Sequence, residues 1–372
     1  MRTRLAEQLG LEFPIFAFTH CRDVAAAVSK AGGLGVLGVA GHSPKNLKAE
    51  LEWIENEIGD KPYGVDLLLP ARFAGSDRGG FDAGQMDELL PEQHKRFLDD
   101  LLAQHGVPSL PPDTSLSPEF AVGYERQREV IELVFQQRIA LIASALGPPP
   151  AWMIEKGREH GVKVAALAGT VEHARRHVEA GVDIVVAQGY EAGGHTGTVS
   201  TMVLVPEVVD AVAPVPVLAA GGIGNGRQLT ASLALGAEGV WCGSVWLTTE
   251  EAETHPVVKQ KFLKAGSSDT VRSRSLTGKP ARQLRSAWTD AWEDPSNPDP
   301  LPMPLQPRLV REAQARINRT AHNNPGSEQL ANYFVGQVVG SMNHVKSVRT
   351  VIEELATEYA DTMERLDQLA ED

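Results

Sequence analysis

Short runs of small and β-branched apolar residues alternate along the chain with stretches of helical periodicity, and glycine separates many of them. Continuous apolar runs are typical of strands buried on both faces, and helices between consecutive strands favour parallel pairing. Eight runs can be counted, which predicts an α/β fold closed into a (β/α)8 TIM barrel. The predicted strands are residues 13–18, 34–38, 63–69, 139–145, 162–168, 183–188, 215–220 and 239–243.

Two segments depart from this repeat. Residues 70–130 combine a glycine-rich stretch, a charged helical stretch and the proline-rich PSLPPDTSLSPEF, which indicates an insertion after strand three. Residues 251–372 contain TDAWEDPSNPDPLPMPLQP and then helical patterns to the end, which indicates an α-rich C-terminal subdomain. Its last stretch, 345–372, repeats apolar residues at steps of three and four, as one amphipathic helix does. The barrel is then expected to comprise residues 1–69 and 131–250.

The charge balance argues against nucleic acid and anionic membranes as partners. The chain has 35 Lys and Arg against 48 Asp and Glu, a formal net charge of -13, although a local basic pocket is compatible with it. No apolar window approaches the roughly 18 residues of a membrane span, and the N-terminal residues lack the pattern of a signal peptide. Cys21 and Cys242 form no Cys-x-x-Cys pair, which indicates neither a disulfide framework nor a zinc site and fits a cytoplasmic protein.

The stretch AQGYEAGGHTG, residues 187–197, places one histidine among four glycines, beginning at the end of the sixth predicted strand. Gly193 and Gly194 precede His195 and Gly197 follows it, so the sequence leaves space around the imidazole. Histidine titrates near neutrality and can take or give a proton. The pattern predicts a histidine that faces a bound molecule, although a lone loop histidine is more often structural or solvated.

Glycine also ends the last two predicted strands. Gly221 and Gly222 follow the seventh strand, Asn225 can cap the next helix, and Gly243 and Ser244 follow the eighth. In a TIM barrel these two turns commonly hold a phosphate, because glycine lets backbone N–H groups approach it and a helix N-terminus adds partial positive charge. Two tight turns without a ligand are the alternative interpretation.

Other nucleotide and metal motifs are absent from the sequence. GIGNGR has Arg227 in place of the third glycine of a Rossmann fingerprint, and it lies late in the chain. TGKP at 277–280 lacks the hydroxyl residue and the upstream strand of a phosphate-binding P-loop. HExxH and EF-hand patterns do not occur, so no metal is expected.

Taken together, AQGYEAGGHTG, LAAGGIGNGRQLTASLALGAEGVWCGS and the late FVGQ at 334–337 resemble the nitronate monooxygenase family, formerly called 2-nitropropane dioxygenases. The resemblance covers residues 1–70 and 139–340. It implies an FMN-dependent TIM-barrel oxidoreductase that is related to the bacterial flavin-dependent enoyl-acyl-carrier-protein reductases. It also implies a loop near residues 334–337 that returns to the active site.

The resemblance assigns roles to residues of this chain. His195 matches the catalytic acid or base, and Gln188, Gly193 and Gly194 match residues that face the flavin. Lys163, which opens the fifth predicted strand, matches a lysine whose charge favours reduced flavin. The other matches are Ala17 and Phe18 beside the isoalloxazine ring, Ala220, Gly221, Gly222, Gly243 and Ser244 in the FMN phosphate cup, and Gly336 and Gln337 in the returning loop.

Two positions depart from the family pattern. Ala17-Phe18-Thr19 stands where Ala-Pro-Met is frequent, and Gly64-Val65-Asp66 stands where an Asn often follows Gly-Val. Both positions border the flavin or the substrate, so Thr19 and Asp66 are expected in the cofactor site. Asp66 is then either a second acid or base, or a solvated or paired carboxylate.

Three functions are compatible with these residues. The first is oxidation of alkyl nitronates or nitroalkanes with FMN and O2, the second is reduction of an enoyl thioester with NAD(P)H, and the third is a flavin-binding sensor. The insertion after strand three leaves the face where barrel active sites assemble, so it is expected to cover the cofactor or to form one wall of the pocket. The protein is expected to act on a small molecule as a monomer or homodimer.

Overall fold

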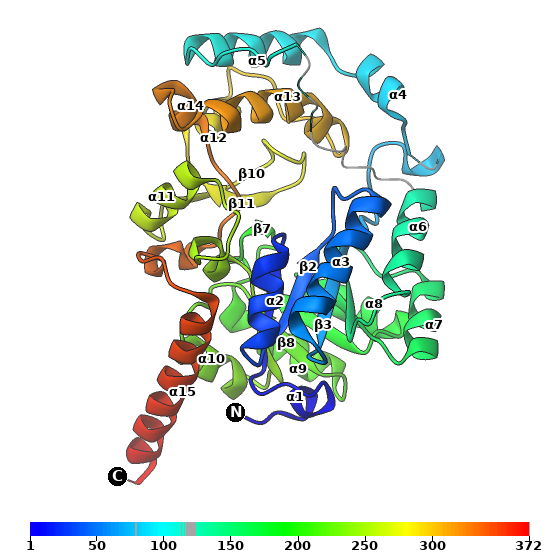
Figure 1. The fold of residues 1–372 in the computed structure, drawn as a ribbon, viewed down its shortest axis with the longest axis vertical. Coiled ribbons are helices and arrows are strands. Elements are labelled where there is room, and N and C mark those ends of the chain that lie inside the picture. The colour runs from blue at the N-terminus through cyan, green and yellow to red at the C-terminus, as the bar shows by residue number, and fades with distance from the viewer. Residues whose placement is uncertain (79, 113, 115, 117–123, 372) are drawn as a thin grey trace.

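The computed structural model describes residues 1–78, 80–112, 114, 116 and 124–371, and part of the predicted insertion therefore lies outside the described residues. Eight parallel strands close into a barrel in the order β1-β2-β3-β4-β5-β6-β8-β9, which confirms the (β/α)8 TIM barrel (Figure 1). The barrel strands are β1 (Ile15–Thr19), β2 (Leu34–Gly38), β3 (Tyr63–Leu68), β4 (Leu141–Ala145), β5 (Lys163–Ala168), β6 (Ile184–Gln188), β8 (Val217–Ala220) and β9 (Gly239–Cys242).

The eight predicted strands are all present, and two of the differences at their ends follow from proline. β1 begins at Ile15 and β8 at Val217, two residues later than predicted in both cases. Pro14 and Pro216 come directly before them and carry no N–H. Their carbonyls still accept hydrogen bonds from neighbouring strands, at 2.9 Å and 3.1 Å, so each strand starts where donors become available.

Residues along each strand alternate between two hydrophobic clusters. One cluster fills the barrel interior and includes Phe16, Val186 and Leu218, and the other packs the outer strand faces against the helices. The helices of the barrel layer are α1 (Arg4–Gln8), α2 (Arg22–Lys30), α3 (Pro44–Ile58), α6 (Tyr124–Val134), α7 (Ala151–His160), α8 (Val171–Ala180), α9 (Thr201–Val212) and α10 (Gly226–Ala234). Leu5 of α1 belongs to the interior cluster and closes the amino-terminal end of the barrel.

A second layer lies over the opposite end of the barrel, at the top of Figure 1. The inserted helix α5 packs on α13, and both contribute to one hydrophobic cluster with Trp288 and Trp292. This layer also contains a β-hairpin, so residues 251–372 are mostly but not entirely helical. Its elements are η1 (Ser76–Arg78), α4 (Ala83–Glu88), α5 (Glu92–Gln104), η2 (Ser244–Thr248), α11 (Pro256–Lys264), β10 (Thr270–Ser273), β11 (Ala281–Leu284), α12 (Ala287–Glu293), α13 (Leu305–Thr320), α14 (Pro325–Leu330) and η3 (Gln337–Ser341).

The last helix, α15 (Val348–Glu371), is the amphipathic helix that the sequence predicts at 345–372. Val348, Ile352 and Leu355 join the outer cluster of the barrel, and the helix packs on α10 and α2. Its C-terminal half extends past the barrel in Figure 1, and Leu366 and Leu369 are exposed there.

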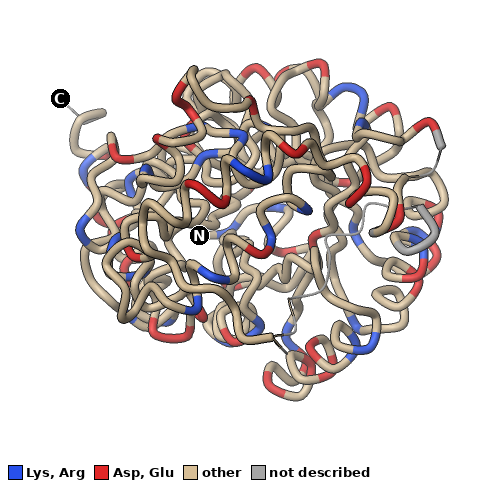
Figure 2. The backbone as a smooth tube through the Cα atoms, turned by 90° about the horizontal axis from the view of Figure 1, so that it is seen from above, with Lys and Arg blue, Asp and Glu red and all other residues tan. Residues whose placement is uncertain are grey.

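Charged residues are spread over the molecule. Figure 2 shows basic and acidic positions interspersed along the backbone.

Within the described residues, no helix is both long enough and apolar enough to cross a membrane. Both cysteines are buried and free.

Candidate active site

A cavity of about 1550 Å³ lies between the carboxyl ends of the barrel strands and the second layer. Residues from the ends of all eight barrel strands or the turns after them line it, together with residues of α13 and of the segment that joins β10 to β11. Most of the site residues predicted from the sequence meet here, although they come from the carboxyl ends of five different strands or the turns after them. The predicted residues in its wall are Phe18, Thr19, Asp66, Gln188, Gly193, Gly194, His195, Ala220, Gly221, Gly222, Gly243 and Ser244.

Aromatic rings form the floor of this cavity. Phe18 and Trp241 both line it and lie nearly parallel, with ring centroids 6.4 Å apart and an interplanar angle of 20°. Phe16 stacks against Trp241 one layer deeper in the barrel. A flat apolar floor of this kind suits a planar ligand.

The glycine-histidine turn is held by a β-sheet that the sequence did not reveal. Gly194 and His195 form the short strand β7 (Gly194–His195), which pairs with β11 in a three-stranded sheet with β10. The fully buried Arg282 of β11 donates hydrogen bonds from Nε and Nη2 to the carbonyl of Tyr190, at 3.1 Å and 3.0 Å. Arg272 of β10 donates to the carbonyl of Thr196 at 3.1 Å. The hairpin therefore fixes both ends of the turn that carries His195.

His195 lies next to two residues of the β10–β11 connection. Its Nε2 is 2.9 Å from the Thr277 hydroxyl. Burial, together with the positive charge of Lys279, lowers the pKa of His195 to about 4. The expectation of an imidazole that titrates near neutrality was therefore wrong, because the sequence does not show how deeply the ring is enclosed or that a lysine faces it. At neutral pH the imidazole is uncharged.

Thr277 holds one side of the imidazole. Its hydroxyl lies 2.9 Å from His195 Nε2 and 3.1 Å from the carbonyl of Lys279, and it accepts from the Lys279 N–H at 3.3 Å. The hydroxyl proton can go to either of the first two atoms, so both neutral tautomers of His195 fit this geometry. Nδ1 forms no hydrogen bond within the described residues. In either tautomer, Nδ1 is the ring nitrogen left to contact a ligand.

The two glycine turns form a cradle of free backbone donors. The N–H groups of Gly222 and Ile223 have no acceptor in the part of the chain that the structure describes, and Ser244 begins the 3-10 helix η2, where the first N–H groups lack intrahelical partners. A Cβ on Gly243 would find its nearest neighbour, Phe18 Cδ1, at 3.7 Å, and its φ of -117° suits any residue. The fold itself does not demand glycine at 243, which is consistent with a ligand that needs the space.

The returning loop reaches the site by backbone packing. The Gly336 N–H donates to Ser244 Oγ at 2.7 Å, and the Gln337 N–H donates to the carbonyl of Glu191 at 2.9 Å. A Cβ on Gly193 would lie 2.8 Å from the Gly336 nitrogen, and one on Gly336 would lie 3.0 Å from the Gly193 nitrogen. These two glycines let two loops meet, whereas Gly194, with φ of +72°, has open space where a Cβ would stand. Gly336 and Gln337 support the cavity wall from behind.

Two predicted cofactor residues lie elsewhere. Lys163 opens β5 at the amino-terminal end of the barrel, where Nζ is 3.4 Å from an Asp183 carboxylate oxygen. Five residue steps along a strand span about 16 Å, so its ammonium cannot reach a ligand at the carboxyl ends. Ala17 belongs to the outer cluster, and its side chain faces the helices. Both assignments were wrong for the side chains, because strand position and alternation decide which residues face the cavity.

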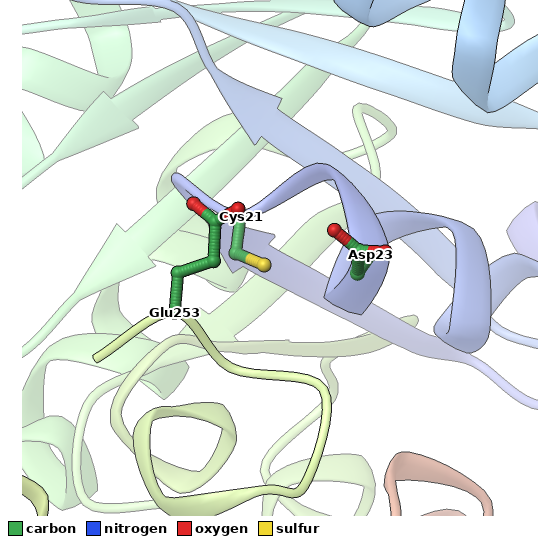
Figure 3. Close-up of side chains that lie close together, drawn as sticks. All are labelled: Cys21, Asp23 and Glu253. Atoms are coloured by element: carbon green, nitrogen blue, oxygen red, sulfur yellow. The ribbon is translucent and has the colours of Figure 1, made fainter. Parts of the chain in front are cut away.

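Cys21, Asp23 and Glu253 lie close together (Figure 3), and Cys21 and Glu253 line the cavity. Their ligand atoms lie within 4.8 Å of one another. Burial, with a further contribution from the charge of Glu253, raises the pKa of the Cys21 thiol, whose Sγ donates to the carbonyl of Glu251 at 3.2 Å. A protonated, hydrogen-bonded thiol is a poor metal ligand, so this cluster gives no reason to revise the expectation that the site holds no metal.

Comparison with known proteins identifies the family of the chain. The family model described as nitronate monooxygenase matches residues 2–358. The chain belongs to the nitronate monooxygenase family. Nitronate monooxygenase family members are flavin-dependent oxidoreductases, so the protein is an enzyme of that class.

Individual relatives cover the whole chain. A Mycobacterium tuberculosis protein named as a candidate monooxygenase is 60% identical over 100% of both chains, and a "Probable nitronate monooxygenase" of Staphylococcus saprophyticus is 31% identical over 98% of this chain and 99% of its own. Among solved structures, a nitroalkane oxidase from Streptomyces ansochromogenes has a TM-score of 0.80, 26% identity and coverage of 97% and 99%. FabK from Thermotoga maritima has a TM-score of 0.74, 28% identity and coverage of 99% of each chain.

Three residues beside the glycine-histidine turn could not be identified from the sequence: Thr277, Lys279 and Arg282. The stretch TGKP at 277–280 matches no complete phosphate-binding loop, and the sequence alone indicates no other role for it. One pattern in the sequence does point to this turn: the polar residues Thr-Gly-Lys stand between two short strands, and loops between strands often carry functional side chains.

We expect Thr277→Val to lower kcat by about fivefold to tenfold, the effect of one lost hydrogen bond on the orientation of His195. Thr277→Ser keeps the hydroxyl and serves as the control, so it should retain turnover within about twofold. Steady-state kinetics on variants of equal flavin content measure this. Equal activity of Thr277→Val and the wild type would show that the hydroxyl does not orient the ring.

Proposed function

We propose that this protein oxidises alkyl nitronates or nitroalkanes, with FMN as cofactor and O2 as electron acceptor. The observation that carries the proposal is the pairing of an uncharged His195 with the cationic Lys279 in one cavity. A nitronate is an anion, so Lys279 attracts it and no proton donor is required. A nitroalkane must first lose a proton, and Nδ1 of His195 can take it when the other nitrogen carries the ring proton, but the lowered pKa makes the ring a weaker base than free imidazole, so the site suits a preformed nitronate better.

FMN fits the residues of the cavity better than a dinucleotide. The unpaired N–H groups of Gly222, Ile223 and Ser244 can hold one phosphate, and the Ser244 hydroxyl, which already accepts from Gly336, has its proton left to donate. The parallel rings of Phe18 and Trp241 offer a flat surface for the isoalloxazine ring. When bound, FMN would supply the electron transfer from the substrate to O2.

The chain's own residues would orient the substrate and manage its proton. Lys279 would hold the anionic nitro oxygens, and Thr277 would orient the imidazole of His195 through Nε2, which leaves Nδ1 free for the substrate. Arg272 and Arg282 would keep the turn rigid through the carbonyls of Thr196 and Tyr190. The second layer covers the strand ends and limits the access of water to the reaction.

A second function, reduction of an enoyl thioester with NAD(P)H, is favoured by the size of the cavity. Ligand pockets commonly measure about 300–1,000 Å³, and 1550 Å³ leaves room for FMN and a bulky substrate. Against it stands the protonation state of His195. Burial, together with the charge of Lys279, lowers its pKa to about 4, which disfavours the imidazolium at neutral pH and makes this residue a poor proton donor.

Two measurements test the proposal. The purified protein should be yellow and release FMN, not FAD, on denaturation, and a nitronate should reduce the flavin in the absence of O2 while NADPH does not. Colourless protein that ignores added FMN would contradict the cofactor assignment. Rapid anaerobic bleaching by NADPH would favour the thioester reductase, and a bound flavin that neither substrate class reduces would favour a sensor. A cytoplasmic location and a monomeric or dimeric state stay predictions from the sequence.

A further inference from the structure

A buried carboxyl group in the cavity wall has no role in the mechanism above. Asp66 lies near the carboxyl end of β3, and its side chain faces the barrel interior because Val65 and Leu67 belong to the outer cluster. It is 5% exposed and lines the cavity. Its Oδ2 has no hydrogen-bond partner within the described residues.

The surroundings of Asp66 offer nothing that stabilises a negative charge. Gly38 of β2 and Ala143 of β4 stand opposite it in the sheet. The nearby Ser144 hydroxyl donates instead to the carbonyl of Gly147, at 2.8 Å. An ionised carboxylate in such a place lacks both a counter-ion and a donor, and burying it would cost several kcal/mol.

The titratable groups that line the cavity near Asp66 do not supply a counter-ion for its carboxylate within the described residues. His20, His42 and Arg72 line the cavity from the segments after β1, β2 and β3, and residues 145–148 after β4 carry no titratable side chain. His20 has its Nδ1 2.9 Å from the carbonyl of Gly38, and burial lowers its pKa, so it is uncharged at neutral pH. Burial alone accounts for a pKa of Asp66 well above the usual range of aspartic acid.

We propose that Asp66 is held as a neutral carboxylic acid and donates a hydrogen bond to an acceptor atom of the ligand in the cavity. The acceptor is an oxygen or a ring nitrogen, carried either by the flavin or by the substrate. Protonation gives the buried group one donor to offer, and a ligand acceptor satisfies it where the protein does not. Deprotonation at high pH would replace this donor by a negative charge and weaken binding. The identity of the ligand rests on the proposed function, whereas the protonation state of Asp66 does not.

The first experiment uses the protein without added ligand. Asp66→Asn keeps the shape and removes the titration. Because the pKa of Asp66 is raised by folding, the unfolded chain gains stability from ionisation as the pH rises above about 4, and the wild type loses stability relative to Asp66→Asn until the folded pKa is reached. The Tm of Asp66→Asn minus the Tm of the wild type should therefore rise by roughly 2 °C per pH unit between pH 5 and pH 7. A constant difference would overturn the proposal, whatever the cofactor.

The second experiment measures FMN affinity by quenching of flavin fluorescence between pH 6 and pH 9. Wild-type affinity should fall as the pH rises, Asp66→Asn should show no such fall, and Asp66→Ala should bind about fivefold to tenfold more weakly at pH 6. Unchanged FMN affinity of Asp66→Ala with a raised KM would place the acceptor on the substrate. Unchanged affinity and unchanged KM would overturn the proposal. If the wild type binds no FMN at all, the proposed function fails and the melting experiment still decides the state of Asp66.

Discussion

Replacing His195 by Asn is expected to lower kcat by about 100-fold to 10,000-fold, the usual contribution of a positioned proton acceptor or donor. Asparagine can still hydrogen-bond to Thr277, and the Arg272 and Arg282 contacts to the turn do not involve the imidazole. The variant should therefore keep its FMN and its Tm while it loses turnover. Steady-state kinetics with a nitroalkane, on protein of measured flavin content, provide the test.

The pH dependence of kcat provides a control for the His195→Asn experiment. Since the pKa of His195 is held to about 4, turnover that uses the uncharged ring should be flat between about pH 6 and 8 and fall only in more acid solution. A reaction that needs the imidazolium would instead slow about tenfold for each pH unit above 4. His195→Asn should abolish the acid limb. Turnover of His195→Asn within a few-fold of the wild type would assign the proton to another group.

The barrel could be predicted from the sequence because its determinants are local. Each strand is a short apolar run such as residues 34–38, and each is followed by a helix, so the order of elements alone limits the topology. The first residue of a strand was predicted too early where a proline such as Pro216, which has no backbone N–H, precedes it. The predicted turns around Gly222 and Gly243 meet at one cavity because parallel strands bring their carboxyl ends to the same face.

The environment of the site could not be predicted in this way, because it depends on contacts between distant segments. Thr277 and Lys279 are more than eighty residues from His195 in sequence, yet Thr277 hydrogen-bonds to its ring, and Lys279 adds to the burial that lowers its pKa. The short strand β7 exists only because β11 pairs with it. Lys163 shows the converse: the sequence already places it at the start of a strand, the end away from the cavity, so the family match alone gave the wrong expectation.

The insertion shows why a deletion is a poor test of its function. It was expected to cover the cofactor or form a wall of the pocket, and Met86 and Leu116 do line the cavity. Leu98 and Leu102 of α5, however, are buried in the cluster that includes Leu309 and Val310 of α13. Removing the segment would expose this cluster, so a loss of activity would not separate substrate recognition from stability.

Gly243→Val is expected to weaken FMN binding by tenfold or more, which corresponds to about 1.4 kcal/mol of binding free energy, and so to lower the FMN content of the purified protein. The backbone at 243 accepts a side chain, with φ of -117° and no neighbour closer than 3.7 Å to a Cβ, so the substitution adds bulk without strain. Gly222 is a less informative position, because its φ of +69° would strain a β-branched residue whether or not a phosphate lies there. Gly266→Val is the matched control, since Gly266 also has space for a Cβ, with Asp269 Oδ2 at 3.5 Å, and is not among the residues that line the cavity.

Both variants should melt within a few degrees of the wild type, and only Gly243→Val should elute without its yellow colour. Titration with FMN, followed by fluorescence quenching, then measures how far the affinity has fallen. The branched side chain would occupy the approach to the N–H group of Ser244, which begins η2 and is one of the donors assigned to the phosphate. Full FMN content in Gly243→Val would place the phosphate elsewhere in the cavity, and an equal loss in Gly266→Val would attribute the effect to folding and not to the cradle.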